Sequence, residues 1–279
     1  MSILTKSIRN MRSIVTNPPL AAAYARWMAG KLRGEVIATL PFAAEIGGFE
    51  NFSNYWGTLC KIPSVQQIEH LASYLHGDSA VCLDVGANIG SFSLILGKRL
   101  PECVIHAFEP APNTFGILSA NLARNGLARV EAHQLAVAEH AGTVRFSDEP
   151  SSSQRNHIVN AEEVVIRSCE VPATSLDEFC ELRQIERIGF IKVDCEGVEP
   201  LVLRGAKRLL REKRIGAMLV EVCPRNLGVF DFSVRDLIAS VAGVPYAFYR
   251  FDENGLVGEQ LTEREISDVV SEDFLLLPM

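Results

Sequence analysis

Apolar residues gather in short runs from about residue 80 to the C-terminus of this 279-residue chain, and helix-like segments separate the runs. The runs are four to eight residues long, as buried strands are. Strands that alternate with helices at short intervals require right-handed crossovers and form a largely parallel sheet. The pattern therefore predicts an α/β fold. Strands are expected at 81–85, 103–108, 130–137, 142–147, 164–171, 188–193, 217–222, 246–252 and 274–277.

The segments between these runs have the composition and spacing of amphipathic helices. Pro63 and Pro112 begin two of them, where proline removes no helical hydrogen bond, and Gly126 follows the end of one. Helices are expected at 64–76, 91–100, 112–125, 175–182, 199–210 and 233–241. Nearer the N-terminus, we expect a helix at 20–32 and a short strand at 35–42.

A glycine turn follows the first strand of the predicted sheet. Residues 83–90 read LDVGANIG, and a predicted helix begins directly after them. Such a turn lets the backbone approach a nucleotide-like ligand at the carboxyl edge of a sheet. Dinucleotide-binding turns read G-x-G-x-x-G, which places a pyrophosphate on the helix end. Here Asn88 replaces the second glycine, between Gly86 and Gly90, and this favours a ligand without phosphates, such as S-adenosylmethionine.

Acidic residues mark the ends of four predicted strands: Asp84, Glu109, Asp194 and Glu221. In an open parallel sheet these ends line one edge, where ligands bind. Glu109 lies 25 residues after Asp84, at the end of the next strand. An acid there accepts hydrogen bonds from both hydroxyls of a ribose. The combination of glycine turn and acid is typical of both NAD enzymes and methyltransferases.

Several motifs in this order resemble the FkbM family of S-adenosylmethionine-dependent methyltransferases. The resemblance covers roughly residues 75–279 and rests on LDVGANIG at 83–90, FEP at 108–110, IKVDCEGVE at 191–199, LRGA at 203–206, VEV at 220–222 and FLLLP at 274–278. It implies the Rossmann-like class I methyltransferase fold, a seven-stranded, mostly parallel sheet with helices on both faces and an antiparallel last strand. It also implies O-methylation of hydroxyls on small molecules such as polyketides, or on sugars.

The resemblance also implies roles for particular residues, by position in the motifs. Glu109 would hold the ribose, with Pro110 beside it, and Ala136 would lie near the adenine. Asp194 would contact the cofactor and, with Glu196, would face the methyl group and the acceptor. The loop on the methionine side of the cofactor would be formed by Asp84, Gly86, Asn88 and Gly90.

Methyl transfer to an alcohol needs a general base, because a protonated hydroxyl is a poor nucleophile. Asp194 and Glu196 are the best candidates, since the D-x-E spacing on an extended strand end puts both on one side of the chain. Two carboxylates this close raise the pKa of one of them, which suits it to accept a proton. We therefore assign these two residues as catalytic.

A divalent metal is an alternative use of the same acids. Asp194, Glu196 and Glu221 all offer oxygen ligands, as Mg²⁺ requires. Acids at a sheet edge more often contact ribose or substrate, so no metal site is assigned. Loss of activity in EDTA would favour the metal.

The charge and cysteine content limit the remaining readings. The net charge of −7 argues against a protein that grips nucleic acid through a broad basic face. The seven cysteines show no metal-ligand spacing and suit free thiols in a reducing cytoplasm. Pro18, Pro19 and Arg26 interrupt the apolar stretch near the N-terminus, so we expect neither a cleaved signal peptide nor a membrane span. A cytoplasmic protein is the expectation.

The chain is expected to divide into an N-terminal extension, residues 1–60, and a methyltransferase domain, residues 61–279. The extension shows no family resemblance, and its aromatic and amide-rich stretch at 49–56 is a candidate lid over the substrate.

Two alternatives from other functional classes stay open. One is a nucleotide-binding oxidoreductase, which the missing second glycine disfavours. The other is a cofactor-binding module that has lost activity and serves in an interaction. Calorimetry with S-adenosylmethionine and with NAD distinguishes the oxidoreductase from a methyltransferase. A methyl-transfer assay distinguishes the inactive module from an active enzyme.

Overall fold

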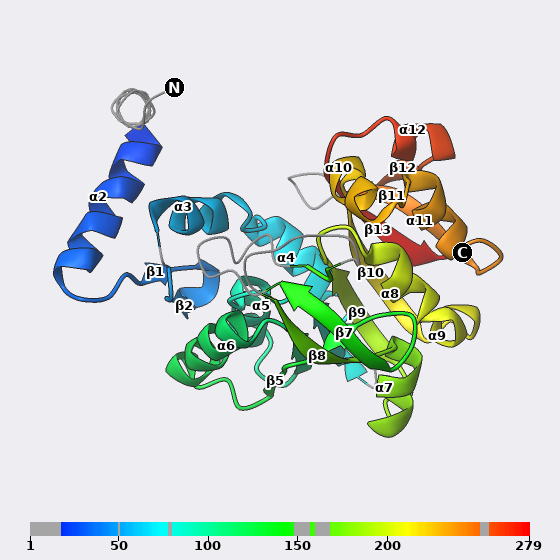
Figure 1. Ribbon diagram of the computed structural model, residues 1–279, viewed down its shortest axis with the longest axis horizontal. Helices are drawn as coiled ribbons and strands as arrows, with labels where there is room; N and C mark the ends of the chain where they lie inside the picture. The colour runs from blue at the N-terminus through cyan, green and yellow to red at the C-terminus, as the bar shows by residue number, and fades with distance from the viewer. Residues whose placement is uncertain (1–17, 50, 78–79, 148–156, 160–167, 252–256) are drawn as a thin grey trace.

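The computed structural model describes residues 18–49, 51–77, 80–147, 157–159, 168–251 and 257–279. Its main sheet has the strand order β12-β11-β13-β10-β9-β3-β4-β5 (Figure 1). The five strands from β10 to β5 are parallel, and β13 lies antiparallel between β10 and β11. The strands are β3 Val81–Val85, β4 Val104–Phe108, β5 Val130–His133, β9 Ile188–Val193, β10 Ile215–Val222, β11 Tyr246–Phe251, β12 Val257–Gln260 and β13 Glu272–Pro278.

The predicted α/β fold is confirmed, with one difference in strand number. The main sheet has eight strands in the described part of the chain, where seven were expected. The additional strand, β12, pairs antiparallel with β11 at the edge of the sheet. Its sequence is Val-Gly-Glu-Gln and most of it is exposed, so the strand has no apolar pattern by which it could be predicted. As expected, the last strand of the chain, β13, is antiparallel to its neighbours.

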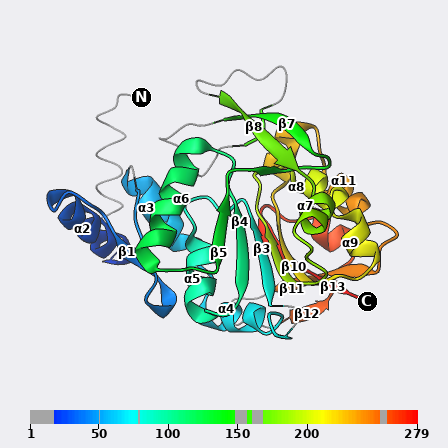
Figure 2. The same cartoon turned by 90° about the horizontal axis from the view of Figure 1, so that it is seen from below.

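Helices cover both faces of the sheet because the strands are apolar on both sides. Along β3, Cys82 packs in one hydrophobic cluster while Leu83 and Val85 pack in another, which is the two-residue period of a strand. Figure 2 shows one group of helices on each side. The first group is α4 Val65–Ala72, α5 Ser91–Arg99 and α6 Pro112–Asn125, and the second includes α7 Leu176–Leu182, α8 Glu199–Arg204, α9 Lys207–Arg211 and α11 Val234–Ser240.

The helix expected at 199–210 is two helices, α8 and α9. The chain breaks near Gly205, where a Cβ atom would lie 2.2 Å from the carbonyl oxygen of Ala138. Two further short helices, α10 Pro224–Leu227 and α12 Glu263–Ser267, had not been expected, because four or five residues are too few to show helical periodicity.

A small second sheet stands beside the main one. It contains β6 Ala136–Val137, β8 Ser168–Thr174 and β7 Gly142–Ser147, in that order. The strand expected at 130–137 is therefore divided between β5 in the main sheet and β6 in the small one. The strand expected at 164–171 is observed as β8, while residues 164–167 and 151–156 lie outside the described part of the chain.

The N-terminal part consists of α2 Pro18–Leu32, β1 Ala38–Thr39, β2 Glu45–Ile46 and α3 Phe52–Cys60. The strand expected at 35–42 shrinks to the two residues of β1, because the 3-10 turn Pro41–Ala43 follows directly. Most of the candidate lid forms α3, so its role as a lid stays a prediction. Among the described residues, the helices lack the length and apolar composition needed to cross a membrane.

Two asparagines of α6 join this N-terminal part to the sheet. The Gly47 N–H donates to Asn121 Oδ1 at 2.9 Å, and the Glu45 N–H donates to Asn125 Oδ1 at 2.8 Å. Asn125 donates in return to the Glu45 carbonyl. Because both asparagines are buried, these bonds fix the N-terminal part relative to the helices that cover the sheet.

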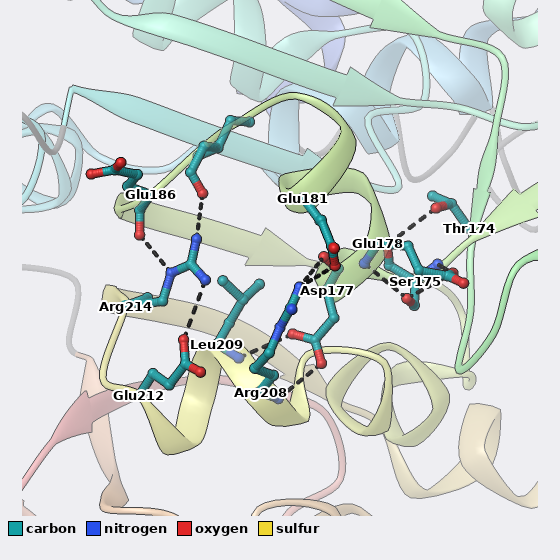
Figure 3. A network of polar contacts seen from close by, with 11 residues as sticks. Thr174, Ser175, Asp177, Glu178, Glu181, Glu186, Arg208, Leu209, Glu212 and Arg214 are labelled. Atoms are coloured by element: carbon teal, nitrogen blue, oxygen red, sulfur yellow. Dashed lines mark hydrogen bonds and ion pairs between the residues drawn. The ribbon is translucent and has the colours of Figure 1, made fainter.

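A polar network ties α7 to α9 (Figure 3). The Asp177 carboxylate accepts the backbone N–H groups of Arg208 and Leu209 at 2.8 and 3.0 Å. The Arg208 side chain donates to Glu181, and Ser175 forms a capping box with Glu178 at the start of α7. These bonds hold the helices that cover β9 and β10, the strands from which the site below is built.

Candidate active site

A cavity of about 490 Å³ lies where β3, β4, β9 and β10 reach their carboxyl ends. This is the edge at which open parallel sheets bind ligands. Three of the four acids predicted at strand ends, Glu109, Asp194 and Glu221, line this cavity. The predicted site residues on its wall are Gly86, Asn88, Glu109, Pro110, Ala136, Asp194 and Glu196.

Gly86 allows the loop after β3 to pass close to the end of β9. Its φ of 82° is in the left-handed region, and a Cβ atom would lie 1.9 Å from the carbonyl oxygen of Asp194. The N–H groups of Gly86 and Ala87 both donate to the Phe108 carbonyl, at 3.1 and 2.9 Å. The loop is thereby joined to both neighbouring strands.

The Asn88 position joins the loop to Glu109. Its backbone N–H donates to Glu109 Oε2 at 3.0 Å, and the Ala111 N–H donates to Glu109 Oε1 at 2.9 Å. Asn88 adopts a φ of 51°, which asparagine tolerates better than most residues, and its Oδ1 accepts the Ile89 N–H. Backbone donors therefore orient the buried Glu109 carboxylate at the cavity wall.

Asp84 and Gly90 lie behind this loop and are absent from the cavity wall. The Asp84 side chain is fully buried, and its Oδ2 accepts the Ser93 hydroxyl at 2.6 Å. Its Oδ1 lies 4.0 Å from Lys192 Nζ. Burial raises the pKa of Asp84, and the Lys192 ammonium opposes that rise. The four residues predicted to form one loop therefore divide into two on the wall and two that support it.

The wall beyond Glu109 is apolar. Ala136 is buried there, and Leu135 and Val137 line the same region. Phe146 of β7 and Ile158 extend it from the small sheet. An apolar slot of this kind suits the flat face of an aromatic base.

Asp194, Glu196 and Glu221 gather on the opposite wall, and we call them the carboxylate cluster. Lys192 Nζ donates to Asp194 Oδ2 at 3.0 Å. Burial acts to raise the pKa of Asp194, but Lys192 and Lys61 outweigh it and hold that pKa below its ordinary value. Asp194 is therefore ionised at neutral pH.

Glu221 lies in hydrogen-bonding contact with Asp194. Its buried Oε2 accepts no hydrogen bond from the described residues. Burial, followed by the charge of Asp194, raises the pKa of Glu221 to about 8. A proton on Glu221 is thus retained near neutral pH and makes it a donor to Asp194.

Glu196 follows in a strained turn. Its φ of 56° is unusual for glutamate, and Asn226 of α10 donates to its Oε2 at 2.8 Å. Glu199, fully buried, accepts the N–H groups of Cys195 and Gly197 and fixes the same turn. Burial and the neighbouring Asp194 raise the pKa of Glu196. A glutamate held in an uncommon backbone conformation beside a cavity is typical of a functional position.

The sequence alone did not single out three charged residues of this wall. Lys61 follows α3 and points toward the carboxylate cluster, and Glu272 and Asp273 lie on β13. Asp273 is the register partner of Glu221 across the β10–β13 pair. The sequence did predict the strand that holds Glu272 and Asp273, because β13 ends in the FLLLP motif at 274–278. Lys61 lies outside every motif, so only the folded chain reveals it.

A separate group of possible metal ligands lies on β4 and β5, away from the cavity wall. His106 Nδ1 lies 3.1 Å from His133 Nε2 and 3.7 Å from Glu131 Oε2. Arg183 donates to the same Glu131 oxygen at 3.1 Å. Burial lowers the pKa of both histidines, that of His133 to about 4, so the pair is neutral and joined by a hydrogen bond.

The cavity fits S-adenosylmethionine in size and chemistry. Its volume lies within the range of about 300–1,000 Å³ that is usual for small-molecule sites. Its wall combines an oriented carboxylate at Glu109, an apolar slot at Ala136 and the glycine loop at Gly86 and Asn88. The loop carries no third glycine of the kind a pyrophosphate needs.

Comparison with known proteins agrees with this geometry. A family model described as the methyltransferase FkbM domain matches residues 84–244, which is more than half of the chain. The 31-O-demethyl-FK506 methyltransferase FkbM of Streptomyces tacrolimicus is 33% identical over 156 residues, which cover 46% of this chain and 59% of that protein. The hexuronic acid methyltransferase AglP of Haloferax volcanii is 26% identical over 216 residues, which cover 76% of this chain and 84% of that one.

Among solved structures, a putative O-methyltransferase from Klebsiella pneumoniae aligns with a TM-score of 0.44 and 14% identity, covering 77% of this chain and 80% of that one. The family is established by the match to its model over residues 84–244. The main sheet carries the seven strands expected for a class I methyltransferase, with β12 added at its edge. The chain therefore belongs to the FkbM family of methyltransferases.

Proposed function

We propose that this chain binds S-adenosylmethionine and transfers its methyl group to a hydroxyl of a small molecule or a sugar. The observation that carries the proposal is the carboxylate cluster, which faces the cofactor loop across one cavity. The names of relatives support the acceptor class, since one acts on 31-O-demethyl-FK506 and another on a hexuronic acid. A cytoplasmic location is part of the proposal, because all seven cysteines are free thiols.

In this proposal each wall of the cavity has one task. Glu109 binds the ribose hydroxyls, and the loop at Gly86 and Asn88 binds the methionine end. When bound, S-adenosylmethionine supplies an activated methyl group and its own leaving group. The protein then has to align the acceptor oxygen with the methyl carbon, and binding both in one cavity achieves this.

The carboxylate cluster accepts the proton of the acceptor hydroxyl. We propose Asp194 and Glu196 as the catalytic residues, as the D-x-E motif predicts. Asn226 orients Glu196, and its raised pKa strengthens it as a base. Asp194 lies between Lys192 and Glu221, which fix its charge, and it lines the same cavity.

The test of this function is transfer of labelled methyl from S-adenosylmethionine to a panel of acceptors. The panel contains neutral sugars, a uronic acid, a macrolide alcohol and RNA. We expect label on a hydroxyl oxygen of a sugar or small molecule, identified by NMR of the product. Label on RNA, or on nitrogen, would replace the proposed acceptor class.

We propose that methyl transfer needs no divalent metal. Two ammonium groups already face the carboxylate cluster: Lys192 Nζ at 3.0 Å from Asp194 and Lys61 Nζ at 3.9 Å from Glu221. A cation placed among the same carboxylates would be repelled by both. We expect the rate to stay unchanged in excess EDTA. A loss that Mg²⁺ restores would assign the cluster to a metal instead.

A further inference from the structure

Lys61 reaches the site from a part of the chain that precedes the family match at 84–244. It directly follows α3 as its C-terminal cap, and its backbone N–H donates to the carbonyls of Gly57 and Thr58. Those bonds fix its backbone. Ile62 and Pro63, which follow it, line the same cavity, so this segment is part of the wall.

The side chain of Lys61 meets the carboxylate cluster from the open side. Its Nζ lies 3.9 Å from Glu221 Oε1, and 60% of the side chain is exposed. Its charge interacts with Asp194 and Glu196 as well as with Glu221. Burial alone would lower the pKa of Lys61, but these carboxylates outweigh burial and raise it, so the ammonium stays charged across the usual assay range.

The other cation of the site is already engaged. Lys192 donates to Asp194 and lies 4.0 Å from Asp84, on the inner side of the cluster. Glu221 and Glu196 both lie beside the negative charge of Asp194. On β13, Glu272 and Asp273 add acidic groups to this wall, and His157 lies near enough to Glu196 to act on its charge. Within the described ranges, Lys61 is therefore the cation on the solvent side of the cluster.

We propose that Lys61 is a positioning residue of the catalytic site, whose ammonium group favours the ionised, proton-accepting forms of the carboxylate cluster. The catalytic part of this inference rests on the proposed function, whereas the electrostatic part concerns the protein without ligands. An N-terminal segment outside the family match would thus complete the site of the methyltransferase domain.

The charge of Lys61 lowers the pKa values of the carboxylate cluster. Burial and Asp194 raise the pKa of Glu221 to about 8, and Lys61 opposes that rise. Lys61 acts in the same direction on Asp194 and on Glu196. Removing its charge therefore raises the proton affinity of all three carboxylates. A smaller fraction of these carboxylates is then ionised at neutral pH, and a higher pH is needed to ionise them to the wild-type extent.

The experiment compares the wild-type protein with Lys61→Ala and Lys61→Arg, and uses Lys207→Ala as the matched control. Lys207 is an exposed lysine of α9 that does not line the cavity. Carbon-13 NMR follows the carboxyl carbon of Glu221 through a pH titration of the ligand-free protein, with Glu221→Gln identifying the signal. The pH dependence of methyl transfer is measured on the same variants.

We expect Lys61→Ala to move the Glu221 titration to higher pH, while Lys61→Arg and Lys207→Ala leave it near the wild-type position. The rate of Lys61→Ala falls about three- to tenfold near pH 7 and returns to the wild-type level at about pH 9.5. An unmoved titration overturns the proposal, and so does a loss of rate that is equal at all pH values. If no variant transfers methyl at all, the proposed function fails, and the NMR titration still decides the role of Lys61.

Discussion

Replacing Glu196 with Gln is expected to lower kcat between about 100-fold and 10,000-fold, the usual contribution of a general base. The amide has the shape of the carboxyl group but accepts no proton. Asn226 still contacts the side chain, and the turn is held by Glu199, so the fold should persist. Kinetics with the acceptor found in the transfer assay, together with calorimetry of S-adenosylhomocysteine, measure the two effects separately.

The matched control for this variant is Glu102→Gln, at an exposed glutamate far from the cavity wall. It should leave both kcat and cofactor binding unchanged. Unchanged turnover in Glu196→Gln would remove Glu196 from the catalytic role and leave Asp194 as the base. A variant that loses cofactor binding together with turnover would show that Glu196 supports the cavity rather than the chemistry.

Replacing Glu109 with Gln is expected to weaken binding of S-adenosylmethionine about ten- to one-hundredfold, because hydrogen bonds to a charged acceptor contribute about 1.5–3 kcal/mol. Both carboxylate oxygens accept a backbone N–H, from Asn88 and from Ala111. An amide NH₂ in place of either oxygen would face one of these donors. The change therefore disturbs the loop as well as the ribose contact.

Calorimetry with S-adenosylhomocysteine measures this loss, with Glu102→Gln again as the control. Thermal unfolding of both variants shows whether the fold is intact. Affinity equal to that of the wild-type protein would mean that the ribose lies elsewhere in the cavity, and it would withdraw Glu109 from the cofactor site.

The fold could be predicted largely from strand and helix patterns. Runs such as 81–85 and 188–193 are largely apolar, with Asp84 and Lys192 as their charged residues, since both faces of these strands are covered by helices. The edge strand β12 was not predicted, because it is held by backbone pairing with β11 and its largely exposed side chains form no apolar pattern. The break between α8 and α9 depends on the close approach of Gly205 to Ala138, a contact between residues far apart in the chain.

The site was predictable where a motif carries it. Gly86, Asn88, Glu109 and Asp194 reach the cavity from the ends of successive strands, as topology requires. Asp84 shows the limit of such reasoning, since a strand-end acid also serves as a buried acceptor, here for Ser93.

Lys61 was not predictable, because its place depends on how α3 packs against the sheet. A single lysine in a segment without a motif has no periodic or spacing signal. The raised pKa of Glu221 was not predictable either, since it arises from burial beside Asp194, a residue 27 positions earlier in the sequence. Both features belong to tertiary packing rather than to local sequence.

Isothermal titration of the wild-type protein with S-adenosylhomocysteine, and separately with NAD, decides whether the cavity is the site of a methyl donor. The geometry of Gly86, Asn88 and Glu109 predicts saturable one-to-one binding of S-adenosylhomocysteine and no measurable binding of NAD. Saturable binding of NAD without binding of S-adenosylhomocysteine would mean that the cavity serves a dinucleotide and not a methyl donor.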